Sequence, residues 1–480
     1  MTAQTAARTE EARPGSKPGR GESLWSAEHR ALTVGLVLTI TFIASEALAV
    51  VTIMPLVARD LHGLGLYGWV FSAFMLGNII GIVAAGRQAD RYGPARPFLG
   101  GLVLFGAGLT IAGLAPSMLV LVGGRALQGI GAGAVPAVAY VAIGRCLPES
   151  LRARMMAVLS TAWVVPGLVG PAVSAAVATL VGWRWVFLGL LPLVAVTGSL
   201  AMPALIRIGR DRAVPDSIEA EHRLADGLVV ATGAGVILAG LTIAARSGPV
   251  ALGAGLLVVG AAALARSLRR LLPAGTFTAR PGLPAVILCR GLLTFSFFGA
   301  DAYVTLTIAT VRHHTPALAS LAVTGATLAW TAGAWLQSRL NGQWPPRRFV
   351  GWGVVIIATG LAAMASVLLP AVPVAVGVAA WTVAGFGIGL SYAPISLLML
   401  RAAPAGREGW ASASLSLADV LGTALGIGAG GAAVAAASAH GWLLASGVAV
   451  AFAVSAAGLA ALGAASRRLP RALPATDPGA

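Results

Sequence analysis

The segment SEALAVVTI at residues 45–53 is matched by ADAYVTLTI at residues 300–308, and each holds one carboxylic acid within an apolar run. Around these segments, further residues recur 256 positions apart. The pairs are Gly77 and Gly333, Gly86 and Gly342, Gly129 and Gly385, Gly131 and Gly387, Gly133 and Gly389, Arg145 and Arg401, and Pro148 and Pro404. One common offset across five segments indicates an internal repeat. Because the repeating unit consists of long apolar segments, the sequence predicts a membrane transporter with two related halves.

The composition requires lipid as the solvent. Hydrophobic residues make up 57% of the 480 residues and charged residues only 10%, whereas soluble proteins carry about 25% charged residues. The net charge of +16 suggests nucleic acid, but the arginines lie in short loops between apolar stretches, so no nucleic-acid partner is expected. The two cysteines lack metal-type spacing, and neither a metal nor a cofactor is expected.

The apolar stretches predict an all-α polytopic membrane protein with fourteen transmembrane helices, since a span needs about 20 apolar residues. The helices are expected at 31–58, 66–86, 97–115, 118–142, 153–178, 184–206, 225–246, 249–268, 283–311, 317–340, 349–369, 372–400, 410–436 and 440–464. The predicted parts are a disordered cytoplasmic tail (1–30), an N-terminal six-helix bundle (31–206), a central region with two extra helices (207–282), a C-terminal six-helix bundle (283–464) and a cytoplasmic tail (465–480). The two bundles are pseudo-symmetric.

The arginines also predict the orientation. Most of the arginines fall in every second loop. By the positive-inside rule, loops rich in arginine lie in the cytoplasm. Both termini are therefore expected in the cytoplasm, in the plasma or inner membrane of a cell. A monomer is expected.

Three short motifs lie in or next to the predicted helices of the first half. The loop after the second helix reads GRQADRYGPAR, and the fourth helix opens with RALQGIGAG. The fifth contains PGLVGPAVSA, which is close to an antiporter pattern but departs from it at Pro166, Ser174 and Ala175. The three motifs resemble those of the major facilitator superfamily. The matching residues are Gly86, Asp90, Arg91, Gly93 and Arg96 in the first motif, Arg125, Gln128, Gly129 and Gly131 in the second, and Gly170 and Pro171 in the third. With fourteen helices, the chain resembles the drug:proton antiporter group of that superfamily.

Each motif has a physical interpretation and a simpler alternative. Gly86 permits close helix approach, and Asp90 can pair with arginines of a neighbouring loop as a cytoplasmic gate, or the loop only signals topology. Arg125 must face the protein interior or a partner, because a charge in lipid costs about 2.5–3.5 kcal/mol, or it is purely structural. Gly167, Gly170 and Pro171 form a helix-packing motif that serves antiport or packing alone.

Three acids lie well inside predicted spans, namely Glu46, Asp301 and Asp419. Ionisable groups in the bilayer are candidates for proton relays or substrate sites. The resemblance to antiporters makes Arg125 the favoured partner of Glu46, since the first and fourth helices of related proteins line the cavity. Arg290 is a possible partner for Asp301. The alternative for each acid is a structural salt bridge or hydrogen bond.

A bulky amphipathic substrate needs an apolar and aromatic cavity wall. The candidates are Gln128, Trp163, Phe295, Phe297, Phe298, Tyr303, Trp330 and Tyr392, although most aromatic residues in membrane proteins serve packing or the interface.

These features predict proton-coupled export of drug-like molecules by alternating access. The alternatives are proton-coupled uptake of a metabolite and a lipid-handling membrane protein. No phosphate-binding loop supports ATP-driven pumping. No cluster of catalytic residues supports an enzyme.

Overall fold

The computed structural model describes residues 23–26, 29–208, 218–246, 248–341, 343–404 and 407–470. Within these ranges the chain is helical and forms no β-strand beyond one isolated bridge between Asn341 and Trp344. Fourteen helices are long and apolar enough to cross a membrane, which confirms the predicted number. The expected tails fall largely on residues 1–22, 27–28 and 471–480, which lie outside the described residues.

The first half of the chain supplies six spans. Its helices are α1 (Arg30–Asp60), α2 (Tyr67–Tyr92), α3 (Ala95–Gly113), α4 (Met118–Cys146), α5 (Glu149–Thr161), α6 (Val164–Val177), α7 (Arg184–Leu188) and α8 (Leu191–Ile208). A 3-10 turn, η1 (Leu64–Leu66), precedes α2, and a π-helical turn, η2 (Ala178–Gly182), extends α6.

The second half supplies six more spans after an inserted pair. The pair is α9 (Ile218–Ala245) and α10 (Val250–Leu271), followed by the 3-10 turn η3 (Thr276–Thr278). The last helices are α11 (Leu283–Leu306) with its π-helical end η4 (Thr307–Val311), α12 (Pro316–Leu340), α13 (Pro346–Ser366), α14 (Val374–Ala402), α15 (Glu408–Ala439) and α16 (Leu444–Ser466).

Two spans predicted as continuous helices are broken, so the expected helices at 153–178 and 184–206 were wrong in this respect. The fifth span is interrupted at Ala162, between α5 and α6, and the sixth at Gly189, between α7 and α8. Pro166 and Pro192 stand four residues after Ala162 and Leu188. Proline has no N–H to donate to the carbonyl four residues earlier, and its ring clashes with that carbonyl. Proline thus accounts for both breaks.

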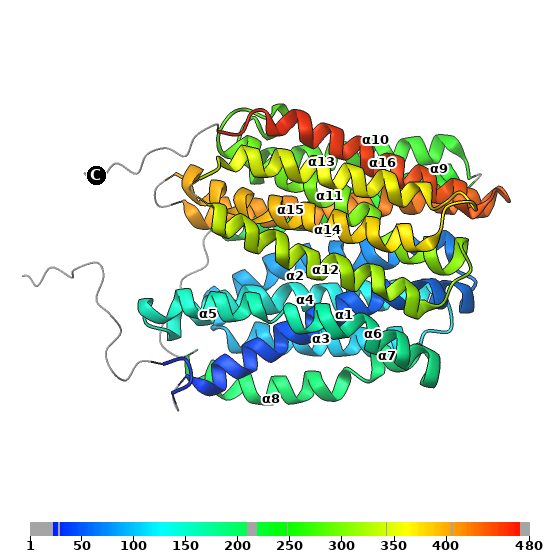
Figure 1. The fold of residues 1–480 in the computed structure, drawn as a ribbon. Helices are drawn as coiled ribbons and strands as arrows, with labels where there is room; N and C mark the ends of the chain where they lie inside the picture. Colours follow the sequence, from blue (N-terminus) through cyan, green and yellow to red (C-terminus); the bar gives the residue numbers. More distant parts are fainter. Residues whose placement is uncertain are drawn as a thin grey trace, which may run out of the picture.

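The two halves repeat the same packing. In the first, α4 packs between α2 and α3; in the second, α14 packs between α12 and α13. Figure 1 shows α1–α8 in the lower part of the view and α11–α16 above them. The halves meet where α2 contacts α15 and where α6 contacts α12.

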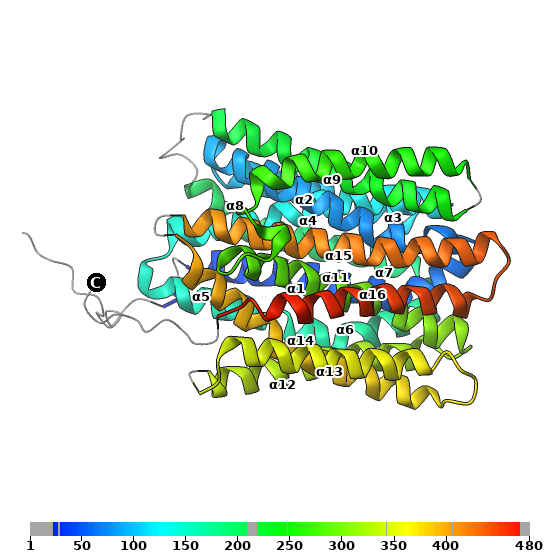
Figure 2. The same ribbon diagram turned by 90° about the horizontal axis from the view of Figure 1, so that it is seen from above.

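The inserted pair touches both halves. Helix α9 packs on α10 and also contacts α2 and α15, and Figure 2 shows the pair on the side of the molecule opposite α12 and α13. Trp69 of α2 donates a hydrogen bond to Thr242 of α9 at 3.0 Å, and Ser414 of α15 donates one to the carbonyl of Leu271 in α10 at 3.0 Å. The pair therefore covers one seam between the halves.

Candidate functional site

Glu46, in the middle of α1, forms a buried cluster with two residues of α4. The exposed fractions are 1% for Glu46, 2% for Arg125 and 0% for Gln128. Nη1 of Arg125 donates to Oε1 of Glu46 and to Oε1 of Gln128, the latter at 3.1 Å. Gln128 donates to the same Glu46 oxygen at 3.3 Å. Nε of Arg125 also donates a hydrogen bond to the carbonyl of Val70, and the guanidinium lies over the ring of Phe74.

This cluster can hold charged groups away from water because its members form hydrogen bonds with one another. A buried ion pair needs further hydrogen bonds to offset the loss of hydration, and Gln128 and Val70 supply them to Arg125 and Glu46. The second carboxylate oxygen of Glu46, Oε2, is buried and has no hydrogen-bond partner among the described residues. One oxygen of the acid is therefore held and the other is free to accept a proton. Gln128, expected to line an open cavity, belongs instead to this cluster.

Asp301 takes the equivalent place in the second half. Its Oδ1 accepts a hydrogen bond from Nε1 of Trp381 at 2.7 Å. Trp381 stands 256 residues after Arg125 and Asp301 stands 255 after Glu46, so the repeat pairs acid with donor in both halves. The possible partnership with Arg290 was wrong, because within the described residues Asp301 forms no ion pair. One half therefore binds its acid with a cation and the other with a neutral donor.

Asp419 of α15 lies in a third polar cluster, in which Tyr392 separates it from an arginine. The hydroxyl of Tyr392 donates to Oδ2 of Asp419 at 2.7 Å. The guanidinium of Arg290 lies over the Tyr392 ring, 3.5 Å from its centroid, and its Nη2 donates to Ser396. Nε and Nη1 of Arg290 and Oδ1 of Asp419 are buried without a hydrogen-bond partner among the described residues. This acid and arginine are near each other but not directly paired.

Aromatic rings connect the two polar clusters of the second half. Phe297 stacks on Trp381 with centroids 5.1 Å apart, and it meets Trp330 edge-on at 5.9 Å. Trp330 in turn contacts Phe298 at 6.1 Å and Tyr392 at 5.3 Å. Phe298, Trp330 and Tyr392 are only partly buried. These three rings form a partly exposed aromatic surface, and Phe297 packs it against Trp381. Their role as the wall of a substrate cavity stays a prediction.

Two other cavity candidates lie elsewhere. Tyr303 has an exposed fraction of 0% and donates to the carbonyl of Ile427 at 2.5 Å, so in this conformation it packs α11 on α15. Trp163 is 47% exposed at the break before α6. It lies one turn before Gly167, whose α-carbon faces the Thr327 side chain of α12 across the seam between the halves.

The glycines of the motifs differ in their surroundings. Among the described residues, a methyl group at Gly86 or Gly170 would have no neighbour within 4 Å, so these residues do not show the close helix approach expected at the two positions. Gly93 ends α2 with φ of 80°, a backbone conformation that favours glycine. Gly167 allows the contact between α6 and α12, and Pro171 is buried within α6.

The loop proposed as a cytoplasmic gate is described in part. Arg91 and Arg96 both lie over the ring of Tyr92, with centroid distances of 5.0 and 5.3 Å. The side chain of Asp90 is outside the described residues, and the gate role of Asp90 stays a prediction.

Three hydrogen bonds cross between the halves near the end of the bundle where α1 ends and α2 begins, here called the outer end. They run from Tyr67 Oη to the Ala302 carbonyl (2.9 Å), from Ser72 Oγ to the Ala424 carbonyl (2.9 Å) and from Thr305 Oγ1 to the Val51 carbonyl (2.8 Å). Gly68 of α2 and Gly431 of α15 touch there, since a methyl group on Gly68 would lie 2.6 Å from the Gly431 α-carbon. Sequence reasoning missed these residues, because small polar side chains in spans have many uses.

The chain is similar to known transporters over most of its length. A sequence profile described as Major Facilitator Superfamily matches residues 34–427. A probable multidrug-efflux transporter of Mycobacterium tuberculosis is 28% identical over 447 residues, covering 89% of this chain and 93% of the relative. Multidrug resistance protein 3 of Bacillus subtilis is 30% identical over 181 residues, covering 38% and 35%.

Solved structures share the fold. An auto-inhibited peptide transporter of the POT family has a TM-score of 0.63 at 17% identity, covering 91% of this chain and 97% of that chain. A D-xylose–proton symporter has a TM-score of 0.62 at 15% identity, covering 93% and 99%. At these identities the likeness concerns the fold alone.

Proposed function

Because this chain belongs to the Major Facilitator Superfamily, we propose that it exports drug-like or amphipathic small molecules in exchange for protons. It is a multi-pass membrane transporter and not an enzyme. The observation that carries the proposal is the buried cluster of Glu46, Arg125 and Gln128, with one carboxylate oxygen of Glu46 unpaired. A carboxylate enclosed within a span is a candidate proton carrier.

In the proposed cycle, Glu46 exchanges a proton between the two sides. With Glu46 ionised, its charge and that of Arg125 cancel. When the free oxygen of Glu46 takes a proton, the cluster gains one positive charge and Arg125 loses its counter-ion. A cationic or dipolar substrate bound nearby is then disfavoured, and loss of the proton reverses this change. Substrate and proton thus compete for one negative charge, which is the requirement for antiport.

Asp301 and Asp419 are proposed as further proton or substrate sites in the second half. Asp301 is held by a neutral donor, Trp381, so its ionised form has no cation to balance it. Asp419 retains an unpaired oxygen beside the partly exposed ring of Tyr392. The aromatic wall of Phe298, Trp330 and Tyr392 would bind the apolar part of the substrate.

Alternating access is proposed as rocking of the segment 31–206 against the segment 283–464. The hydrogen bonds that join the halves at the outer end, together with the contact of Gly68 with Gly431, support a conformation closed on that side. We place both termini in the cytoplasm, as the arginine distribution indicates, so the outer end faces outside. The transporter is proposed to act as a monomer.

Export is favoured over uptake by the relatives. Proteins named as multidrug-efflux transporters match nearly the whole chain. The solved neighbours include a symporter, but they share only the fold. Proton-coupled uptake is therefore an outcome of the test and not a second proposal.

The test is transport in proteoliposomes with an imposed pH gradient and a fluorescent amphipathic cation as the probe. Wild-type protein is expected to accumulate the probe against its gradient and to dissipate the pH gradient in doing so. Glu46→Gln and Asp301→Asn should each abolish gradient-driven transport, because each amide keeps the shape of the acid but cannot release a proton.

The matched control is Asp60→Asn. Asp60 is an acid at the outer end of α1, its side chain is more than half exposed, and it accepts a hydrogen bond from Trp183. This variant should transport like wild type. The proton role is wrong if both buried-acid variants, inserted and monodisperse, still drive the probe uphill. Movement of the probe in the same direction as protons would show symport and contradict the proposed antiport.

A further inference from the structure

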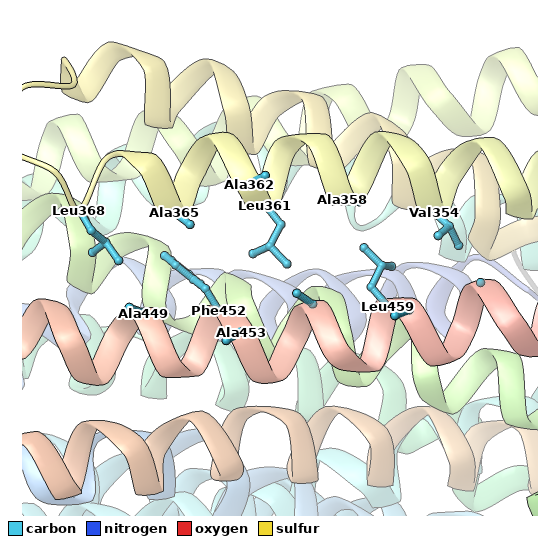
Figure 3. A pocket seen from close by; sticks show the side chains of 13 residues that line it. Val354, Ala358, Leu361, Ala362, Ala365, Leu368, Ala449, Phe452, Ala453 and Leu459 are labelled. Carbon is cyan, nitrogen blue, oxygen red and sulfur yellow. The ribbon is translucent and has the colours of Figure 1, made fainter.

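An apolar groove lies on the second half of the molecule, between α13 and α16. It encloses about 440 Å³ and is lined by thirteen residues that carry no polar side chain. Figure 3 shows Leu361 of α13 and Phe452 and Leu459 of α16 pointing toward one another across it. Most of the remaining wall is alanine, such as Ala358 and Ala456.

The small side chains explain why there is a groove at all. Ala358, Ala362 and Ala365 follow one face of α13, and Ala453, Ala456 and Ala460 follow one face of α16. Small residues allow two helices to approach until their backbones touch. Along this stretch the small side chains of α13 and α16 do not fill the space between the two helices, and it remains open.

One mouth of the groove is strongly basic. Arg347 and Arg348 lie in the first turn of α13, and Arg467 and Arg468 directly follow α16. The groove starts about 9 Å along α13 from Arg348 and about 6 Å along α16 from Arg467, at 1.5 Å per residue, because its first residues at this end are Val354 and Gly463. Among the described residues, none of the four arginines has an acidic partner. Four arginines that lack an acidic partner among the described residues therefore lie near one end of the apolar groove, with Arg348 over the ring of Trp344.

We propose that this groove binds an anionic phospholipid, with an acyl chain between α13 and α16 and its phosphate at the four arginines. The alanine-rich wall of α16 runs from Ala449 to Gly463, about 21 Å of helix. One leaflet of the hydrocarbon core is about 15 Å thick, so the wall is long enough for a whole acyl chain. Basic pockets between transmembrane helices on the cytoplasmic side suit acidic lipid headgroups.

A second copy of the chain fits this surface less well. Two copies in one membrane hold their α13 and α16 at the same depth, so contact through the groove would bring two sets of four arginines together. Like charges at such close range repel unless counter-ions separate them. A lipid phosphate supplies the missing negative charge, whereas a second copy doubles the positive one.

The test measures retention of phosphatidylglycerol and phosphatidylcholine by the detergent-purified full chain, by native mass spectrometry during lipid titration. The wild-type protein is expected to prefer phosphatidylglycerol. The double variant Arg347→Gln/Arg348→Gln should bind it roughly thirtyfold more weakly, since each arginine near a headgroup contributes about 1 kcal/mol. Ala456→Leu should weaken lipid binding because the larger side chain fills the groove. If this variant does not fold, Ala362→Leu on the opposite wall tests the same point.

Each variant has a matched control. Ala457 neighbours Ala456, is also exposed and does not line the groove, so Ala457→Leu should leave binding unchanged. Arg266→Gln/Arg269→Gln removes two arginines from α10, which lies on the side of the molecule opposite α13 (Figure 2). This variant should also leave lipid binding unchanged. The proposal is overturned if the groove and arginine variants bind phosphatidylglycerol like wild type, if all variants lose both lipids equally, or if light scattering finds a dimer that Ala456→Leu dissociates.

Discussion

At the scale of single residues, each half holds one buried acid, but the group that donates a hydrogen bond to it differs. Glu46 and Asp301 occupy equivalent places, and so do their partners Arg125 and Trp381. A guanidinium neutralises an acid, whereas an indole N–H only donates one hydrogen bond to it. The first half therefore holds a neutral ion pair, and the second holds an acid whose charge is not compensated by a contact.

The charge balance of the first cluster leads to a stability prediction. Arg125→Gln leaves Glu46 without its cation, and breaking a buried pair from one side costs about 3–5 kcal/mol. The double variant Glu46→Gln/Arg125→Gln places two neutral amides in the same site and should recover most of the loss. The measurement is the unfolding temperature of the purified protein in detergent. A double variant as unstable as Arg125→Gln alone would mean that charge balance is not what stabilises the cluster.

At the scale of helices, glycine allows the backbones of paired helices to touch. A methyl group on Gly129 of α4 would overlap the carbonyl of Phe74 in α2, and one on Gly385 of α14 would overlap that of Ala326 in α12. These two glycines are repeat partners. The closest helix contacts therefore recur in both halves.

The glycine contacts predict which motif positions tolerate a larger residue. Gly129→Ala should lower the unfolding temperature and the yield of folded protein, because backbone cannot move aside as a flexible side chain can. Gly86→Ala is the matched control, since no described residue lies within 4 Å of the added methyl group, and helix propensity alone favours alanine there by up to about 1 kcal/mol. Equal effects of both substitutions would contradict the assigned packing.

At the scale of the whole molecule, the halves are joined at the outer end and bridged at one seam by α9 and α10. The contacts at the outer end are hydrogen bonds of Tyr67, Ser72 and Thr305 to backbone carbonyls. Each contributes about 1 kcal/mol, which is small enough to break in a transport cycle. The inserted pair contacts both α2 and α15, so the proposed rocking of the halves would require it to slide on one of them.

These outer contacts predict the balance between conformations. Tyr67→Phe combined with Thr305→Val removes two of them and should raise the population open at the outer end by roughly tenfold or more, given about 1 kcal/mol for each bond. The measurement is the distance between spin labels on α2 and α15 at that end.

The matched control for this experiment is Thr110→Val, whose hydroxyl bonds only the carbonyl of Gly106 within its own helix. It should leave the distance distribution unchanged. A distribution unchanged in the double variant as well would show that these bonds do not hold the outer end closed.

The motifs and the repeat predicted part of the site, and the reason differs from residue to residue. The pairing of Trp381 with Asp301 follows from the 256-residue repeat once Arg125 is matched to Glu46. Arg290 was matched to the wrong acid, because closeness along α11 says nothing about the direction in which its side chain points. Gly86 lies in a family motif, yet no described residue lies within 4 Å of a methyl group placed on it, so the motif match did not reveal its packing.

By itself the sequence determined the number of spans, the duplication and which acids lie in the membrane, because length, offset and hydropathy are properties of the linear chain. Only the tertiary structure decided that Tyr392 stands between Arg290 and Asp419, that Gly68 meets Gly431, and that α13 and α16 leave a groove. Those features depend on how far each helix is rotated about its axis and on what faces it from a distant part of the chain, and neither is encoded in any single segment.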